Sequence, residues 1–361
     1  MLEQVRISGR QIYFIAFCLI ISSSVLSGRT IIKEAKQDAW LVILIGLGVN
    51  ALYSVVLYRL GLRYPQQTLF QYSEKILGKL PGKFVGFIFV LFFLAMGAIL
   101  LRTTLDSLTT ALMPETPPVA LGIIFLLVST YAVYAGLEVL ARISEIIAPM
   151  VFISLLSIIL FNLKWIDLDK LKPILQLSPM EVIEFSLLPS GLFGLSIAFG
   201  GLMAYHNDPQ KALRSQLGGV ITGVILIMLL LMAYISIYGP STGPKHIFVI
   251  YRLAQTVKVG DFFERLEAVE VFLWIAGNFV TVSIFYYLSA LGLGQLLRLN
   301  QYQSITPFIG ITMMVTSQII FHSIADRFVF TMKIFPYLAL GVEGFLTSFL
   351  LIVSFFRHTK T

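Results

Sequence analysis

Charged residues and cysteine are scarce in this chain. Only 12% of its 361 residues are charged, whereas soluble domains carry roughly 25%. Hydrophobic residues make up 57% of the sequence. The single cysteine, Cys18, has no second cysteine to pair with, so an intrachain disulfide is excluded. This composition indicates an all-α polytopic membrane protein.

Signatures of catalysis and of metal binding are also missing from the sequence. The four histidines, His206, His246, His322 and His358, lie far apart and lack the spacing of metal ligands. No glycine-rich loop precedes a lysine, and no nucleophile is paired with a base. The net charge of +7 is scattered, with no basic run for nucleic acid. We therefore expect no enzyme, no cofactor and no nucleic-acid partner.

Ten apolar stretches could each cross a bilayer, which needs about 20 residues per helix. They cover residues 11–32, 39–60, 83–112, 118–136, 141–162, 187–207, 216–238, 262–290, 305–323 and 332–356. The polar connection 163–178 divides them into five and five. We predict a single transmembrane domain, 1–361, built from one five-helix repeat over 7–162 and a second over 178–358. The more polar stretch 61–82 predicts a short helix lying on the membrane.

The sixth apolar stretch has a composition that breaks helices. A proline, a serine and a glycine stand together at 189–191, and Gly194 follows one turn later. Proline removes a backbone donor, and glycine weakens a helix by about 1 kcal/mol relative to alanine. Inside a membrane, a broken helix is tolerated only within protein or along a wet cavity. We predict the break at 189–194 and a close-packing surface at 198–201, with a break at 198–201 as the alternative.

The first apolar stretch is interrupted by three successive serines, Ser22, Ser23 and Ser24. One interpretation is a second break; the other is a continuous helix in which each hydroxyl bonds its own preceding turn. Breaks in the first helix of both halves match the inverted-repeat plan of transporters, in which unwound segments form the binding site. We therefore predict that helices one and six are discontinuous.

The predicted breaks would bring helix ends into one cavity. Helix N-termini suit a carboxylate and C-terminal carbonyls suit an ammonium group, so an amino acid fits both. The predicted ligand site combines the serines Ser22, Ser23 and Ser24 with residues of spans three, six and eight. These are Gly97, Leu101, Gly191, Gly194, Asn278, Thr281 and Phe285.

Ionisable residues inside apolar spans are candidates for proton transfer or gating. Arg102 and Asp106 are four residues apart and share a helix face, so simple pairing is the alternative. Glu270 lies in the eighth span. Glu343 lies in the tenth span, between Gly341 and Gly344, with no cation nearby in sequence. We assign all four ionisable residues to proton or gating roles, against ordinary helix-to-helix bonding.

Four sequence segments resemble the B subunits of bacterial spore germinant receptors, within the amino acid–polyamine–organocation superfamily. They are ISGRQ at 7–11, QDAW at 37–40, YHNDP at 205–209 followed by Lys211, and FERLEAVE at 263–270 followed by Trp274. The chain departs from the family where Ser22 to Ser24 fill a break that usually contains glycine. It also has Leu192 near a position where members often have glutamate.

The resemblance implies a ten-helix inverted-repeat fold in the inner membrane of the spore. It also implies a complex with an A subunit and a lipoprotein C subunit that senses nutrients such as amino acids. The leading hypothesis is therefore a nutrient-sensing subunit that binds a small ligand at the two breaks and triggers germination. The alternative is a proton-coupled amino acid permease.

Overall fold

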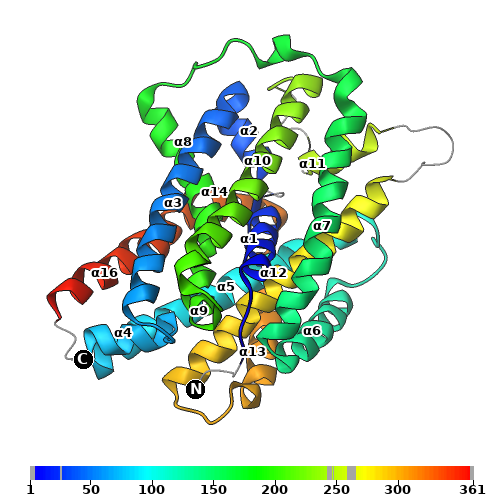
Figure 1. The fold of residues 1–361 in the computed structure, drawn as a ribbon. Coiled ribbons are helices and arrows are strands. Elements are labelled where there is room, and N and C mark those ends of the chain that lie inside the picture. The colour runs from blue at the N-terminus through cyan, green and yellow to red at the C-terminus, as the bar shows by residue number, and fades with distance from the viewer. Residues whose placement is uncertain (1–4, 25–26, 242–245, 247, 258–265, 358–361) are drawn as a thin grey trace.

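The computed structural model describes residues 5–24, 27–241, 246, 248–257 and 266–357, and these form a helical bundle (Figure 1). The α-helices are α1 (Gly9–Ser24), α2 (Gly28–Ala35), α3 (Ala39–Arg63), α4 (Leu69–Leu77), α5 (Lys79–Ala111), α6 (Pro118–Ala135), α7 (Leu137–Asn162), α8 (Pro179–Gly194), α9 (Phe199–Leu202), α10 (Ala212–Tyr238), α11 (Val249–Gln255), α12 (Leu266–Leu296), α13 (Thr306–Ile319), α14 (Ile324–Lys333), α15 (Phe335–Ala339) and α16 (Thr347–Phe356). Over these described ranges, the only β-structure is one isolated bridge.

The described residues contain eight helices long and apolar enough to cross a membrane, or nine if α13 and α14 count as one bent span. The predicted all-helical, multi-pass class is confirmed, whereas the number ten is not. The predicted first span divides because α1 ends at Ser24 and α2 begins at Gly28. Within the predicted ninth span, 305–323, helix α13 ends at Ile319, and α14 follows at an angle of 101° to it. The predicted start of the eighth span, at residue 262, lies outside the described residues.

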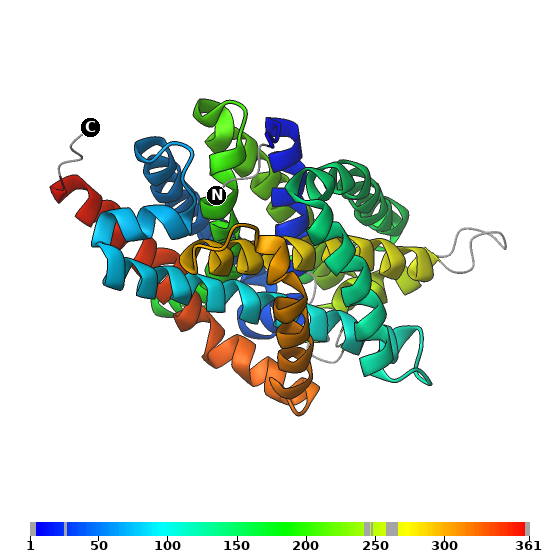
Figure 2. The same ribbon diagram turned by 90° about the horizontal axis from the view of Figure 1, so that it is seen from below.

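α1 runs through the interior of the bundle, where it contacts α7, α8, α10 and α12 (Figure 1). Its approach to α10 is close because glycines line the contact. A Cβ atom on Gly219 would lie 2.1 Å from the backbone oxygen of Tyr13, and one on Gly223 would lie 3.0 Å from Ile20. Small residues of this kind let membrane helices pack backbone to backbone. Nearby, α5 and α12 run side by side across the bundle (Figure 2).

The connection between the two halves is tied to the start of α3. The buried carboxylate of Asp38 accepts backbone N–H groups of Leu175, Gln176 and Leu177 at 2.7, 2.5 and 3.0 Å. The amide of Gln37 donates to the carbonyl of Pro173 at 3.0 Å. The QDAW segment therefore has a structural role: its acid satisfies the N–H groups of a turn in the 163–178 connection.

α4 confirms the helix predicted within 61–82, but its apolar face is buried in the protein rather than laid on a membrane. A capping box formed by Thr68 and Gln71 starts the helix. Phe70, Tyr72 and Ile76 are each about 1% exposed and pack into the core beside α5. The sequence pattern identified the amphipathic helix but could not say which apolar surface would cover it.

The break predicted at 189–194 is wrong in position. α8 continues through Pro189 to Gly194, and a 3₁₀ turn, Leu195–Ala198, follows. Gly46 of α3 packs directly against this part of α8: a Cβ on Gly46 would lie 2.9 Å from the Cβ of Pro189. The break therefore comes directly after Gly194, where α-helical hydrogen bonding gives way to the tighter turn.

The close-packing surface predicted at 198–201 is confirmed. A Cβ atom on Gly201 would lie 2.4 Å from Leu288, and one on Gly200 would lie 3.3 Å from Leu57 and Leu69. The tenth span differs from prediction in another way, because α15 continues into a π-helical segment, Leu340–Leu346, before α16. π-Helical turns are rare and occur often at functional sites.

Candidate functional site

A central cavity lies where the two broken helices meet. Its walls come from α1, α2, α5, α8, α14 and α15, and include Ser22, Ser23, Thr30, Leu192 and Arg327. Its volume of about 60 Å³ holds a few water molecules, since one water needs roughly 10–15 Å³ by this measure. A ligand the size of an amino acid would require the walls to move apart.

Hydroxyl groups join the end of α1 to its neighbours. The Ser23 hydroxyl lies 2.9 Å from the carbonyl of Leu19 in its own helix and 3.2 Å from the carbonyl of Leu192 in α8. The hydroxyl of Thr281 in α12 donates to Ser22 at 2.9 Å. Both interpretations of the serines are thus partly right: Ser23 bonds its own turn, and the helix still ends at Ser24. The side chain of Ser24 lies outside the described atoms.

Asn50 of α3 satisfies backbone groups at the second break, and sequence reasoning missed it. Its amide nitrogen donates to the carbonyl of Phe193 at 2.7 Å and to the hydroxyl of Ser196 at 2.8 Å. Carbonyls freed by a helix break need such donors inside an apolar protein. The available signal was a polar residue in the middle of the second apolar span.

The five predicted ligand residues in spans three and eight lie outside the cavity wall, although Thr281 donates to Ser22, which lines it. Gly97 packs against Met313, and Phe285 stacks on Phe93 with ring centroids 5.9 Å apart. Asn278 donates to the hydroxyl of Thr104 at 2.9 Å, and Leu101 is fully buried. The face of α5 that lines the cavity is instead the one with Met96, Leu100 and Thr103. In α5, where nearly every position is apolar, the sequence does not say which side faces inward.

Gly191 and Gly194 do not line the cavity either. A Cβ on Gly191 would lie 2.7 Å from Ala339 in α15. A Cβ on Gly194 would lie only 1.9 Å from the Oε2 atom of Glu343. These glycines let α15 and the π-helical segment approach the backbone of α8, so their role is contact between helices.

Arg102, Asp106 and Arg327 form a buried charge cluster beside the cavity. The Arg102 Nε atom lies 2.9 Å from Asp106, and Arg327 of α14 lies 3.1 Å from the other carboxylate oxygen. Arg102 also donates to the carbonyls of Ser317 and Gln318, at 3.2 and 3.1 Å, where α13 ends. The predicted pairing of Arg102 with Asp106 is confirmed. The cluster holds the sharp bend between α13 and α14 against α5.

Arg327 was missed because it falls between the predicted ninth and tenth spans and would count as a loop residue. Its side chain is 7% exposed and lines the central cavity. The cluster contains two cations and one anion, so one positive charge is uncompensated within it. A guanidinium group in this position can bind a carboxylate through paired hydrogen bonds.

The other two ionisable candidates have contrasting surroundings. Glu270 of α12 accepts a hydrogen bond from the hydroxyl of Ser154 in α7, so it links two helices. Glu343 is 1% exposed, and neither of its carboxyl oxygens has a hydrogen-bond partner among the described residues. Neither residue lines the central cavity.

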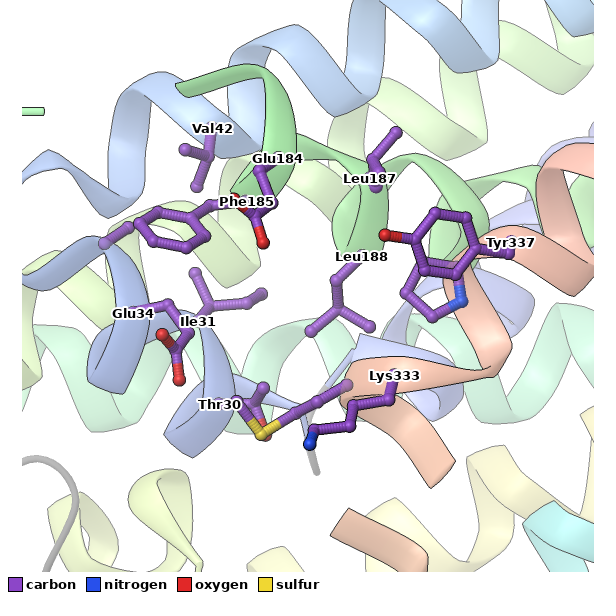
Figure 3. Close-up of a pocket in the computed structure, with 13 residues that line it drawn as sticks. Thr30, Ile31, Glu34, Val42, Glu184, Phe185, Leu187, Leu188, Lys333 and Tyr337 are labelled. Carbon is purple, nitrogen blue, oxygen red and sulfur yellow. The ribbon is translucent and has the colours of Figure 1, made fainter. Parts of the chain in front are cut away.

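An outer cavity of about 200 Å³ lies beside the central one, between α2, the first half of α8 and α14–α15 (Figure 3). Glu34, Glu184, Lys333 and Tyr337 are arranged around it in Figure 3. Glu34 also pairs with Lys33 at 3.3 Å. Thr30 of α2 borders both cavities.

The segment before α1 pairs with the segment after the second broken helix. The Ile7 N–H donates to the carbonyl of Tyr205 at 2.8 Å, and the Asn207 N–H donates to Ile7 at 3.0 Å. His206 accepts the Asp208 N–H at 2.7 Å, and burial lowers the pKa of this histidine. The ISGRQ and YHNDP segments are nearly 200 residues apart in sequence. They lie side by side and are joined by a single parallel β-bridge between Ile7 and His206.

Comparison with known proteins agrees with this arrangement. The family model described as "Spore germination protein" matches residues 6–323. Spore germination protein YndE of Bacillus subtilis (strain 168) is 27% identical, covering 81% of this chain and 82% of the relative. Spore germination protein KB of the same organism is 24% identical over 99% and 97%. Spore germination protein XB of Bacillus anthracis is 26% identical over 76% and 78%.

Solved structures of transporters share the fold. A substrate-bound Na⁺-coupled sialic acid symporter in an outward-open state superposes with a TM-score of 0.71 at 14% identity, covering 96% of this chain and 79% of that one. Mhp1, a nucleobase-cation-symport-1 family transporter, gives 0.70 at 14% identity over 99% and 81%. MhsT in complex with L-phenylalanine gives 0.65 at 13% identity over 95% and 97%. The chain has this transporter fold and belongs to the spore germination protein family.

Proposed function

We propose that the chain is the nutrient-sensing integral membrane subunit of a spore germinant receptor. A small ligand binds in the central cavity, and its binding triggers germination. The observation that carries the proposal is that both broken helices meet at this cavity in a chain of the spore germination family. The cavity is too small for an amino acid as it stands, so binding would part α1–α2 from α8 and α14.

The charge at the cavity wall favours a ligand with a carboxylate. Arg327 and Arg102 together outnumber Asp106, and all three are largely buried. Buried cations attract an anionic group more strongly than exposed ones because water screens them less. The hydroxyls of Ser22, Ser23 and Thr30 offer acceptors for an ammonium group. An amino acid carries both groups, which makes it the favoured ligand class.

The remaining parts of this proposal concern location and partners. The chain lies in the inner membrane of the spore and assembles with an A subunit and a C subunit. Support comes from its relatives, which are named spore germination proteins. The chain acts by binding and conformational change in the lipid bilayer, without catalysis or a cofactor.

The test compares spores that carry the wild-type gene, no gene, or variants of Arg327 across a panel of amino acids. Arg327→Lys keeps the charge but loses the planar fork, and Arg327→Met removes the charge. We expect a weaker response to one nutrient class in both variants. Arg142→Met is the control, because Arg142 is exposed and pairs with Glu138 in its own helix. Equal germination of all strains on every nutrient would refute the proposal.

The alternative function is a proton-coupled amino acid permease. It is favoured by the symporter folds of the structural neighbours and by the buried acid Glu343. Purified protein in liposomes would then accumulate a labelled amino acid when a pH gradient is imposed. Absence of uptake across a broad set of amino acids would reject this alternative.

A further inference from the structure

Glu343 stands at the centre of the π-helical segment Leu340–Leu346, directly against the second helix break. Its side chain is 1% exposed. Its Oε2 atom lies 1.9 Å from where a Cβ on Gly194 would be, so the carboxyl group rests on the backbone at the end of α8. The next residue, Gly344, packs against the ring of Tyr53 in α3.

The carboxyl group of Glu343 has no hydrogen-bond partner in the part of the chain that the structure describes. Neither Oε1 nor Oε2 accepts a hydrogen bond from any described residue. The Oδ1 atom of Asn50, one turn before Tyr53, is also buried without a partner. Glu343 and Asn50 therefore both have buried oxygen atoms near the break that accept no hydrogen bond from the described residues, including from each other.

No charged group among the described residues pairs with Glu343. The π-helical segment, α15 and α16 contain no other charged residue. α8 carries Glu181 and Glu184 only in its first two turns. α3 offers the phenol of Tyr53, and its own Arg59 and Arg63 come later in the helix, with Arg63 over the ring of Phe355.

α5 also touches the π-helical segment, and its charges are used elsewhere. Arg102 and Asp106 belong to the charge cluster. Lys83 donates to the carbonyl of Leu296, and Lys79 is exposed. The surroundings of Glu343 thus contain no counter-charge that would stabilise a carboxylate.

An isolated carboxylate in such a place is costly. Moving an unpaired ion out of water costs several kcal/mol even after relaxation, whereas a neutral carboxylic acid costs far less. The group therefore takes up a proton from water and becomes a carboxylic acid. Ionisation would return that proton to water and leave a charge that must find water or a cation.

We propose that Glu343 is a proton-binding site coupled to the break in α8. With its proton bound, the neutral side chain packs on Gly194 and holds the π-helical segment against α8. When the proton leaves, the carboxylate draws water inward and separates the two segments. The bound species is a single proton, and the site is distinct from the central cavity, so this inference does not rest on the proposed function.

The experiment records infrared difference spectra of the full-length protein in lipid nanodiscs between neutral and alkaline pH. We expect the wild type to show the carbonyl stretch of a protonated carboxyl group at neutral pH and to lose it on alkalinisation. Glu270→Gln is the matched control and should retain the band of Glu343, since Glu270 is also a buried glutamate and accepts a hydrogen bond from Ser154. Glu343→Gln, made in the Glu270→Gln background so that Glu270 contributes no band, should lack it.

A second pair of variants keeps the test independent of the folding of Glu343→Gln. Gly194→Ala inserts a methyl group against the carboxyl and should shift the band, whereas Gly341→Ala meets nothing within 4 Å and should leave it unchanged. Absence of the band in the wild type, or its persistence when Glu343→Gln is combined with Glu270→Gln, would overturn the proposal. Loss of the band on adding Na⁺ or K⁺ at constant pH would assign the site to a metal cation and overturn the proton assignment.

Discussion

The charge cluster Arg102–Asp106–Arg327 and the lone acid Glu343 show two ways of placing ionisable groups in an apolar protein. In the cluster, each charge has an opposite charge within 3.1 Å, and carbonyls at the end of α13 accept further hydrogen bonds. Glu343 is buried more completely than any of the three and has no such partner. An ionisable residue in an apolar span therefore indicates a switch only when its partners are missing.

The paired cluster and the unpaired Glu343 should also affect different properties: the stability of the fold in the first case and the germination response in the second. The cluster joins α5 to α14 through Asp106, so loss of this anion should mainly damage the fold. Glu343 touches the backbone at a helix break and can gain or lose charge, so its replacement should mainly change response. Substitutions in both regions can break or sharpen this distinction.

The largest effect is expected for Asp106→Asn. This change leaves Arg102 and Arg327 buried beside each other without an anion, and breaking a buried pair in this way costs about 3–5 kcal/mol. Thermal unfolding of the purified protein, monitored in detergent, measures the loss. Glu138→Gln is the control, because it removes an exposed pair with Arg142 and should cost at most about 1 kcal/mol. Equal losses in both variants would show that the cluster contributes no more than a surface pair.

The next effect is expected for Gly194→Leu and Gly191→Leu. Added side chains would collide with Glu343 and Ala339, and overpacking of this kind costs about 1–3 kcal/mol. We expect membrane insertion to persist and the germination response to be lost, measured by membrane fractionation and by spore germination. Gly341→Ala should change neither, because its added Cβ meets open space. A normal response in Gly194→Leu would show that close contact with α8 is dispensable.

Glu343→Gln should change stability by less than about 1 kcal/mol, since a neutral amide replaces a neutral acid of similar shape. The expected change is in pH dependence: germination of the variant should vary less with external pH than that of the wild type. The rate of germination at a saturating nutrient, measured over a pH series, checks this. Identical pH profiles would mean that Glu343 does not titrate during the response.

The smallest effect is expected at His206. Its Nδ1 atom accepts a hydrogen bond from Asp208, whereas its Nε2 atom has no partner among the described residues. Burial lowers its pKa, so the folded protein binds this proton less readily than the unfolded chain. Stability should therefore be constant above the unfolded value of about 6.5 and fall as pH decreases below it. Unfolding of wild type and His206→Asn between pH 7.5 and 5 measures this, and a slope of equal size in the variant would contradict it.

Only the part of the candidate site with local sequence signals could be predicted: of the ten predicted ligand residues, Ser22 and Ser23 line the central cavity. Three adjacent serines and a cluster of proline and glycine are unusual in apolar spans, and the structure places Ser22, Ser23 and Leu192 around one cavity. Arg102 and Asp106 are four residues apart, so their pairing follows from helix geometry alone. In each case the interacting groups are close in sequence or share an improbable composition.

Other parts of the site depended on contacts between distant segments. The break after Gly194 is satisfied by Asn50 of α3, which donates to Phe193 and Ser196 from 143 and 146 residues away. Arg327 reaches the cavity because the chain bends by 101° between α13 and α14. The cavity-facing side of α5, with Leu100 and Thr103, is as apolar as its other sides. No local sequence pattern predicts the position of this break, the placement of Arg327 or the inward-facing side of α5.

The amino-acid sequence by itself determined that this protein is helical, crosses a membrane several times and is a member of its family. Those properties follow from composition, from the length of apolar runs and from short motifs. Only the tertiary structure decided which ionisable residues are paired, because pairing depends on what each neighbouring helix presents. Asp106 meets Arg327 from 221 residues away, whereas Glu343 meets the bare backbone of Gly194. The cost of a buried charge depends on those neighbours, and so does the division between structural and switching residues.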